Sequence, residues 1–155
     1  MKLVFFDVDG TLIVPIYKNK KGEMVVGFSD EEWFEYCETQ GENGYQYCKP
    51  VMPVIRYARK KKAEGAKLFV LSTAQTPGEI KAKEHYAEVN FPGLFDEVIT
   101  VPHDHMKVEV IKAKAEEEGV QLSDCELVED TYANVLKAND AGIVATHISS
   151  LVCDL

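Results

Sequence analysis

Five short runs of apolar residues are continuous rather than alternating, and this pattern constrains the fold more than any other feature of the sequence. They span residues 3–6, 68–71, 98–101, 126–128 and 143–145, and the run at 126–128 is the weakest. Strands covered on both faces have such runs, because neither face needs polar side chains. The pattern therefore predicts a buried parallel sheet.

Four segments between these runs have helical character. They span residues 53–64, 77–89, 107–118 and 131–141. The first two open with proline, and glycine follows the first, third and fourth, which is the usual asymmetry of helix ends. Strands that alternate with helices of this length imply right-handed crossovers. We expect an α/β fold: a three-layer sandwich around a Rossmann-like parallel sheet.

The segment from residue 13 to about 50 interrupts this alternation. Residues 13–16 and 24–28 flank a polar, glycine-containing stretch and predict a hairpin. Ser29 followed three residues later by Glu32 predicts a capped helix start. We interpret the segment as a small insert within one domain that spans residues 1–155.

Composition and charge narrow the function classes. The formal net charge of −9 disfavours unspecific binding to nucleic acid or to an anionic membrane, since both need a positive surface. The N-terminal apolar run at 3–6 is too short for the core of a signal peptide. The four cysteines lie far apart, without metal-ligand spacing, which fits reduced thiols. We expect a cytoplasmic protein.

Two carboxylates, Asp7 and Asp9, follow the first predicted strand directly, and Gly10 indicates that the chain turns there. Ligands bind at the carboxyl edge of open α/β sheets. Two carboxylates this close repel each other, and a hard cation such as Mg²⁺ relieves the repulsion. A solvated turn is the alternative explanation, because Asp and Gly favour turns.

Polar residues also follow other predicted strands. Ser72 and Thr73 end the second run, and Glu129 and Asp130 end the fourth. Lys107 stands at the connection after the third run. Each taken singly has a plain structural explanation, as a helix cap or a solvated charge. Their occurrence together at strand ends is harder to explain by turns alone.

With these motifs in view, the chain resembles the haloacid dehalogenase superfamily of phosphohydrolases. Asp7-Val8-Asp9-Gly10-Thr11-Leu12 is similar to the first family motif almost letter for letter. Ser72 resembles the second motif, with Thr73 as the weaker candidate, and Lys107 the third. Glu129-Asp130, with Asn134 behind them, resembles the acidic fourth motif. The resemblance implies a sheet with strand order 5-4-1-2-3.

The resemblance also implies roles for these residues. Asp7 would attack phosphorus and form an aspartyl-phosphate. Asp9 would protonate the leaving oxygen and then accept a proton from the hydrolytic water. Ser72 and Lys107 would hold the transferred group. Magnesium would be held by the Asp7 side chain, the Asp9 backbone carbonyl and Asp130. Glu129 would act through water or orient Lys107.

The short insert resembles a minimal or reduced cap, which leaves the site open to bulky substrates or closed by a neighbouring subunit of a homo-oligomer. The partner would be a phosphorylated small molecule or an exposed phosphate on a larger substrate. The insert is rich in aromatic residues, which either pack it onto the sheet or stack on a base or sugar: Trp33, Phe34, Tyr36, Tyr45 and Tyr47.

Three alternative functions stay open from the sequence. A phosphotransferase or phosphomutase of the same superfamily would use the same residues with a sugar hydroxyl as acceptor. A signalling receiver domain also has clustered acids and a lysine, but its phosphoacceptor follows a middle strand, where this chain has Ser72. A catalytically silent binding module is the third, and the intact acidic motifs argue against it. We expect a magnesium-dependent phosphatase.

Overall fold

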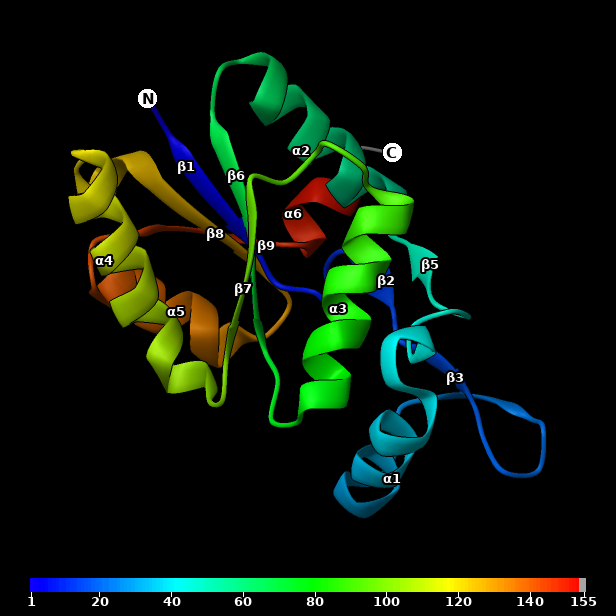
Figure 1. The fold of residues 1–155 in the computed structure, drawn as a ribbon. Coiled ribbons are helices and arrows are strands. Elements are labelled where there is room, and N and C mark those ends of the chain that lie inside the picture. The colour runs from blue at the N-terminus through cyan, green and yellow to red at the C-terminus, as the bar shows by residue number, and fades with distance from the viewer. Residues whose placement is uncertain (154–155) are drawn as a thin grey trace.

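A five-stranded parallel sheet forms the centre of the computed structural model, which describes residues 1–153 (Figure 1). Its strands are β1 (Leu3–Phe6), β6 (Lys67–Thr73), β7 (Glu97–Val101), β8 (Cys125–Glu129) and β9 (Val144–His147). Their order across the sheet is β7-β6-β1-β8-β9. Counted along the chain and read from the β9 edge, this is the expected order 5-4-1-2-3, so the predicted topology is confirmed.

Helices cover both faces of this sheet, which confirms the three-layer α/β class (Figure 1). The helices of the sheet crossovers are α2 (Met52–Ala63), α3 (Pro77–Asn90), α4 (Lys107–Glu118) and α5 (Tyr132–Asp140). A short helix, α6 (Ser149–Val152), follows β9, and short 3₁₀ turns lie at Gly41–Asn43, Asp104–Met106 and Leu122–Asp124. These four crossover helices match the predicted segments within one residue at every end, which is within the usual uncertainty of helix boundaries.

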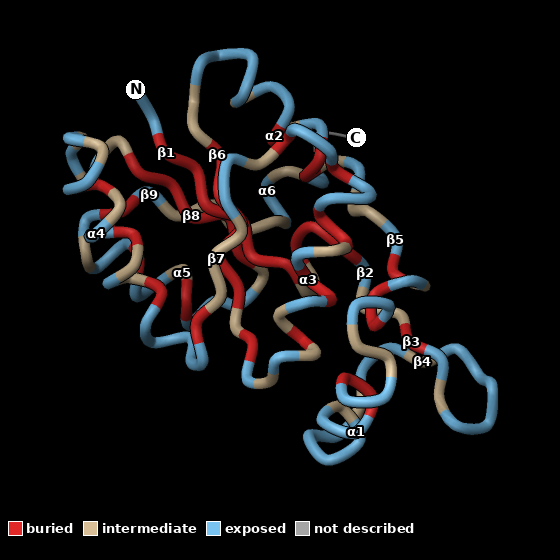
Figure 2. The backbone as a smooth tube through the Cα atoms, in the orientation of Figure 1, coloured by how far each residue is buried: buried red, intermediate tan, exposed pale blue. Residues whose placement is uncertain are grey.

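The continuous apolar strands fill two separate cores because successive side chains point to opposite faces. On one face Val4 and Phe6 pack with residues of α2 and α3. On the other face Leu3 and Phe5 pack with residues of α4 and α5. The buried segments in Figure 2 accordingly concentrate along the central strands. Burial on both faces explains why the β1 run lacks polar residues.

The segment between β1 and α2 contains two small antiparallel ladders and one helix. Strand β3 (Ile16–Lys18) pairs with β4 (Met24–Val26), whereas β2 (Ile13–Val14) pairs with β5 (Lys49–Pro50). The predicted hairpin is therefore present, but its first strand was placed too early. Pro15 separates β2 from β3, so residues 13–14 pair instead with the end of the segment.

Helix α1 (Asp30–Gln40) begins at the predicted capping box. The Ser29 hydroxyl accepts from the Glu32 N–H, and the Glu32 carboxylate accepts from the Ser29 N–H at 3.2 Å. The helix packs against α3, where Gly78 is needed because a Cβ there would overlap the Cys37 carbonyl oxygen. Across residues 1–153, no helix combines the length and apolar character needed to cross a bilayer.

Candidate active site

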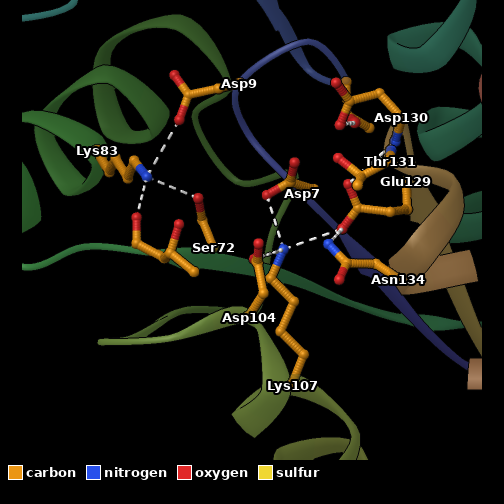
Figure 3. A network of polar contacts seen from close by, with 12 residues as sticks. Asp7, Asp9, Ser72, Lys83, Asp104, Lys107, Glu129, Asp130, Thr131 and Asn134 are labelled. Carbon is orange, nitrogen blue, oxygen red and sulfur yellow. Dashed lines mark hydrogen bonds and ion pairs between the residues drawn. The ribbon is translucent and has the colours of Figure 1, made fainter. Parts of the chain in front are cut away.

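The chain turns sharply after β1 and separates the two motif carboxylates. The N–H groups of Thr11, Leu12 and Ile13 all donate to the Val8 carbonyl oxygen, which closes the turn. Gly10 has φ +77°, a conformation that glycine adopts without strain. Asp7 and Asp9 therefore do not share one strand face, and their side chains enter two different polar clusters (Figure 3).

The first cluster is centred on Lys107, the first residue of α4. Its Nζ lies 3.1 Å from Asp7 Oδ1, 2.9 Å from Glu129 Oε2 and 3.3 Å from Asp104 Oδ1. Burial opposes the positive charge, but Asp7 and Glu129 outweigh it and raise the pKa of Lys107. Lys107 is therefore a buried cation held by carboxylates that come from three different segments.

Glu129, the last residue of β8, is fully buried, and both of its carboxylate oxygens accept hydrogen bonds. One carboxylate oxygen accepts from the backbone N–H groups of Asp130 and Thr131, at 3.0 and 3.3 Å. The other accepts from Lys107 and from Asn134 Nδ2, the latter at 3.2 Å. These contacts fix the carboxylate, and Glu129 in turn fixes the position of the Lys107 ammonium group.

Three carboxylates converge at the carboxyl edge of the sheet. One oxygen each from Asp7, Glu129 and Asp130 lies within 4.8 Å of the others. The Thr11 hydroxyl donates to Asp130 Oδ1 at 3.4 Å, and a Cβ on Gly10 would overlap the other oxygen of this carboxylate. The turn thus leaves room for the Asp130 side chain beside Asp7.

These carboxylates are in an environment that favours a cation. Burial raises the pKa of Asp7 to about 7, while Lys107 lowers it and Glu129 and Asp9 raise it further. Burial also raises the pKa of Asp130. A hard divalent cation prefers carboxylate oxygens, and its charge would stabilise the ionised forms. The donor set therefore suits a metal such as magnesium.

The second cluster is centred on Lys83 in α3, which the sequence analysis did not identify. Its side chain is only 1% exposed and lies 3.2 Å from Asp9 Oδ2 and 3.7 Å from Glu79 Oε2. Its Nζ also donates to Ser72 Oγ at 2.7 Å and to the Thr73 carbonyl oxygen. Lys83 thus connects the first predicted motif with the second (Figure 3).

A sequence signal for this cluster existed. Glu79 and Lys83 are four residues apart in α3, on the same helical face as the buried residues Ala82, Tyr86 and Ala87. Charged side chains on the apolar face of a helix are uncommon unless they are paired, and burial of such a pair marks a polar site. The paired charges could have been identified from their spacing.

Asp9 is held by two tyrosines of the insert as well as by Lys83. The Tyr17 hydroxyl donates to Asp9 Oδ1 at 3.2 Å, and the Tyr45 hydroxyl donates to Asp9 Oδ2 at 3.4 Å. Burial raises the pKa of Tyr45, and Asp9 raises it further, so this hydroxyl stays protonated as a donor. The side chain of Asp9 is directed away from the three-carboxylate group, so a metal contact from Asp9 would use its backbone carbonyl.

The insert aromatics mostly pack rather than form an open stacking surface. Tyr36 and Tyr45 are buried, and Trp33 lies against Tyr17 with ring centroids 4.9 Å apart. Phe34 is exposed, and Tyr47 instead lies near Lys18 Nζ, 5.4 Å from its ring centroid. One edge of this aromatic group borders a cleft of about 470 Å³ that Asp9, Thr73 and Asp104 also line.

No protein-family model and no curated protein matches the sequence. Solved structures are similar in fold. A HAD-superfamily hydrolase of subfamily IA from Geobacter sulfurreducens is 16% identical, with a TM-score of 0.63 over 94% of this chain and 88% of that one. A phosphoserine phosphatase, solved as an analogue of its phospho-aspartyl intermediate, is 15% identical, with a TM-score of 0.59 over 93% and 84%.

A third similar structure is the N-terminal part of a Bacteroides fragilis protein that contains a phosphatase domain complexed with Mg. It is 13% identical, with a TM-score of 0.57 over 94% of this chain and 35% of that one. The chain therefore has the fold of the haloacid dehalogenase-like hydrolases. The resemblance found in the sequence motifs is thus confirmed for the fold.

Proposed function

We propose that this protein is a magnesium-dependent phosphatase that hydrolyses a phosphomonoester through an aspartyl-phosphate on Asp7. The observation that carries the proposal is the convergence of Asp7, Glu129 and Asp130 at one edge of the sheet, where Lys107 contacts the first two. The similar structures of hydrolases and phosphatases support the same class of enzyme.

In the first step, an oxygen of Asp7 attacks phosphorus and the bond from phosphorus to the leaving oxygen breaks. Asp9 gives its proton to that oxygen, so the alcohol leaves in neutral form. Lys107 lies 3.1 Å from Asp7 Oδ1 and balances the negative charge on the transferred group. Ser72, near the end of β6, would bind a phosphate oxygen, with Thr73 as the weaker candidate.

In the second step, water attacks phosphorus of the aspartyl-phosphate and loses a proton to Asp9. The bond between phosphorus and the Asp7 oxygen breaks, which releases phosphate and restores the Asp7 carboxylate. Tyr17 and Tyr45 hold Asp9 in place for both proton transfers. Because Asp9 contacts Lys83 whereas Asp7 contacts Lys107, the proton transfers and the nucleophilic attack are assigned to carboxylates in separate polar clusters.

Asp7, Asp130 and the Asp9 carbonyl would hold magnesium, with Glu129 acting through Lys107 and the surrounding hydrogen bonds. Bound there, the ion supplies positive charge for the phosphoryl oxygens and keeps Asp7 ionised. Two observations fit a metal ion at this place. Gly10 leaves room for the Asp130 carboxylate, and the pKa of Asp7 is raised when no cation is present.

The test is phosphate release from a panel of phosphomonoesters in the presence of magnesium. We expect turnover by the wild-type protein, none by Asp7→Asn, and unchanged turnover by Asp140→Asn, which alters an exposed carboxylate at the end of α5. Excess chelator should stop the reaction. Wild-type-like turnover by Asp7→Asn, or full activity in chelator, would contradict the proposal.

The same panel separates hydrolysis from phosphoryl transfer. Adding sugar acceptors should leave the yield of free phosphate unchanged if water is the acceptor. Formation of a sugar phosphate at the expense of free phosphate would instead indicate a phosphotransferase with the same nucleophile.

A further inference from the structure

The cleft beside Asp9 has an aromatic wall. Tyr17, Phe28 and Trp33 line it, with ring centroids 5.3 Å apart for Tyr17 and Phe28 and 4.9 Å apart for Tyr17 and Trp33. The Trp33 Nε1–H donates to Glu79 Oε1 at 2.8 Å, which fixes the indole at the cleft. These rings belong to the insert, so the insert forms one side of the cleft.

Carboxylates dominate the charge of this cleft. Four acidic residues line it: Asp9, Asp30, Glu79 and Asp104. Within residues 1–153, no lysine or arginine lines the cleft. The two nearby cations lie behind the lining and are already paired. Lys83 contacts Asp9 and Glu79, and Lys107 contacts Asp104, Asp7 and Glu129. His103 is the one histidine among the lining residues.

The two helices that begin at the cleft are capped by side chains of the chain itself. Ser29 caps α1, whose first turn is acidic at Asp30, Glu31 and Glu32. Thr76 caps α3, and its side chain accepts from the Glu79 N–H at 3.2 Å. The positive ends of both helix dipoles are therefore offset by acceptors that belong to the chain.

The cleft is also where the leaving group of a substrate would lie, an argument that rests on the proposed function. Asp9 must reach the leaving oxygen to protonate it, and Asp9 is both part of the catalytic set and part of the cleft lining. A phosphoryl group at Asp7 and Lys107 therefore directs the remainder of the substrate past Asp9 toward the aromatic wall.

We propose that the phosphomonoester accepted here carries a leaving group without any acidic group, an uncharged or cationic alcohol such as an amino alcohol. A carboxylate or second phosphate would face Asp30 and Glu79 with no unpaired cation in the lining, and like charges at a binding site are strongly discriminated against. An ammonium group would instead meet carboxylates and aromatic rings, which both attract cations.

The proposal is tested by binding of phosphonates that cannot be hydrolysed, measured by calorimetry on the wild-type protein with magnesium. The three probes differ only in their far end: 3-aminopropylphosphonate, 3-hydroxypropylphosphonate and 3-phosphonopropionate. We expect the amine to bind at least about tenfold more tightly than the carboxylate, with the alcohol between them. Equal or tighter binding of the carboxylate would overturn the proposal.

Charge reversal at Asp30 provides a second test of the proposal. Asp30→Lys should reduce the preference for the amine over the carboxylate severalfold. Glu31→Lys is the matched control, because it changes the same charge in the same helical turn at a residue outside the lining. Circular dichroism verifies that both variants are folded. A preference that stays at the wild-type value in Asp30→Lys would count against the cleft as the binding place.

Turnover separates this proposal from the proposed function. The corresponding esters are phosphoethanolamine, ethylene glycol monophosphate and phosphoglycolate, with p-nitrophenyl phosphate as a general phosphatase substrate. If the phosphonates bind in the expected order but no ester is hydrolysed, the phosphatase assignment fails and the charge preference of the cleft stands. If the esters are hydrolysed with phosphoglycolate preferred, the phosphatase assignment stands and the leaving-group proposal fails.

Discussion

Replacing Asp7 by asparagine should stabilise the metal-free protein while it abolishes turnover. Burial raises the pKa of Asp7 from 3.8 to about 7, because the folded protein disfavours the ionised carboxylate. Between these two values the folded state therefore holds a proton that the unfolded state has lost. Stability of the metal-free wild type consequently falls as the pH rises from about 4 to 7, and it stays lower above pH 7.

The shift of about 3 pH units corresponds to about 4 kcal/mol, at about 1.4 kcal/mol for each unit. The amide of Asp7→Asn does not ionise, so the variant escapes this loss. We expect the two proteins to have similar stability near pH 4, where Asp7 is largely protonated. At pH 8 the variant should be more stable by up to about 4 kcal/mol.

The assay is urea denaturation in chelator at several pH values, followed by fluorescence of the one tryptophan, Trp33. Asp140→Asn serves as the control, since it removes an exposed carboxylate and should keep the pH dependence of the wild type. Magnesium at about 100 times its dissociation constant should restore about 2.7 kcal/mol to the wild type. It should stabilise Asp7→Asn much less.

The reasoning would be refuted by wild-type and Asp7→Asn stabilities that change in parallel from pH 4 to pH 8. Such a result would mean that burial of Asp7 does not disfavour its charge. It would also remove one argument that a cation is needed at this place.

Two further predictions concern residues around the nucleophile. In a magnesium titration, Gly10→Ala should weaken magnesium affinity about tenfold or more, because the added Cβ would displace the Asp130 carboxylate. Gly22→Ala is the control: Gly22 has a similar φ of +78° and nothing within 4 Å of an added Cβ, so magnesium affinity should not change. Lys83→Met should lower kcat on the order of a hundredfold, because it removes the cation that holds Asp9 and Ser72. Magnesium affinity should change little. A loss of magnesium affinity as large as the loss of kcat would instead assign Lys83 to the metal site.

The sequence alone determined the fold class and the edge at which the carboxylates gather. Continuous apolar runs such as Leu3–Phe6 are local patterns, and strands buried on both faces require them. The capping box of Ser29 and Glu32 is equally local and was predicted correctly. Resemblance of the Asp7–Leu12 motif supplied the strand order, which apolar runs by themselves do not contain.

Only the tertiary structure decided which side chains share a partner. Lys107 is 100 residues from Asp7 in sequence, and crossover geometry alone brings its ammonium group to that carboxylate. The spacing of Glu79 and Lys83 could have indicated their local pairing, but only the tertiary structure joins Lys83 to Asp9 and Ser72, which come from two other segments. The pairing of Ile13–Val14 with Lys49–Pro50 was missed because a strand of two residues carries too little pattern to specify a distant partner.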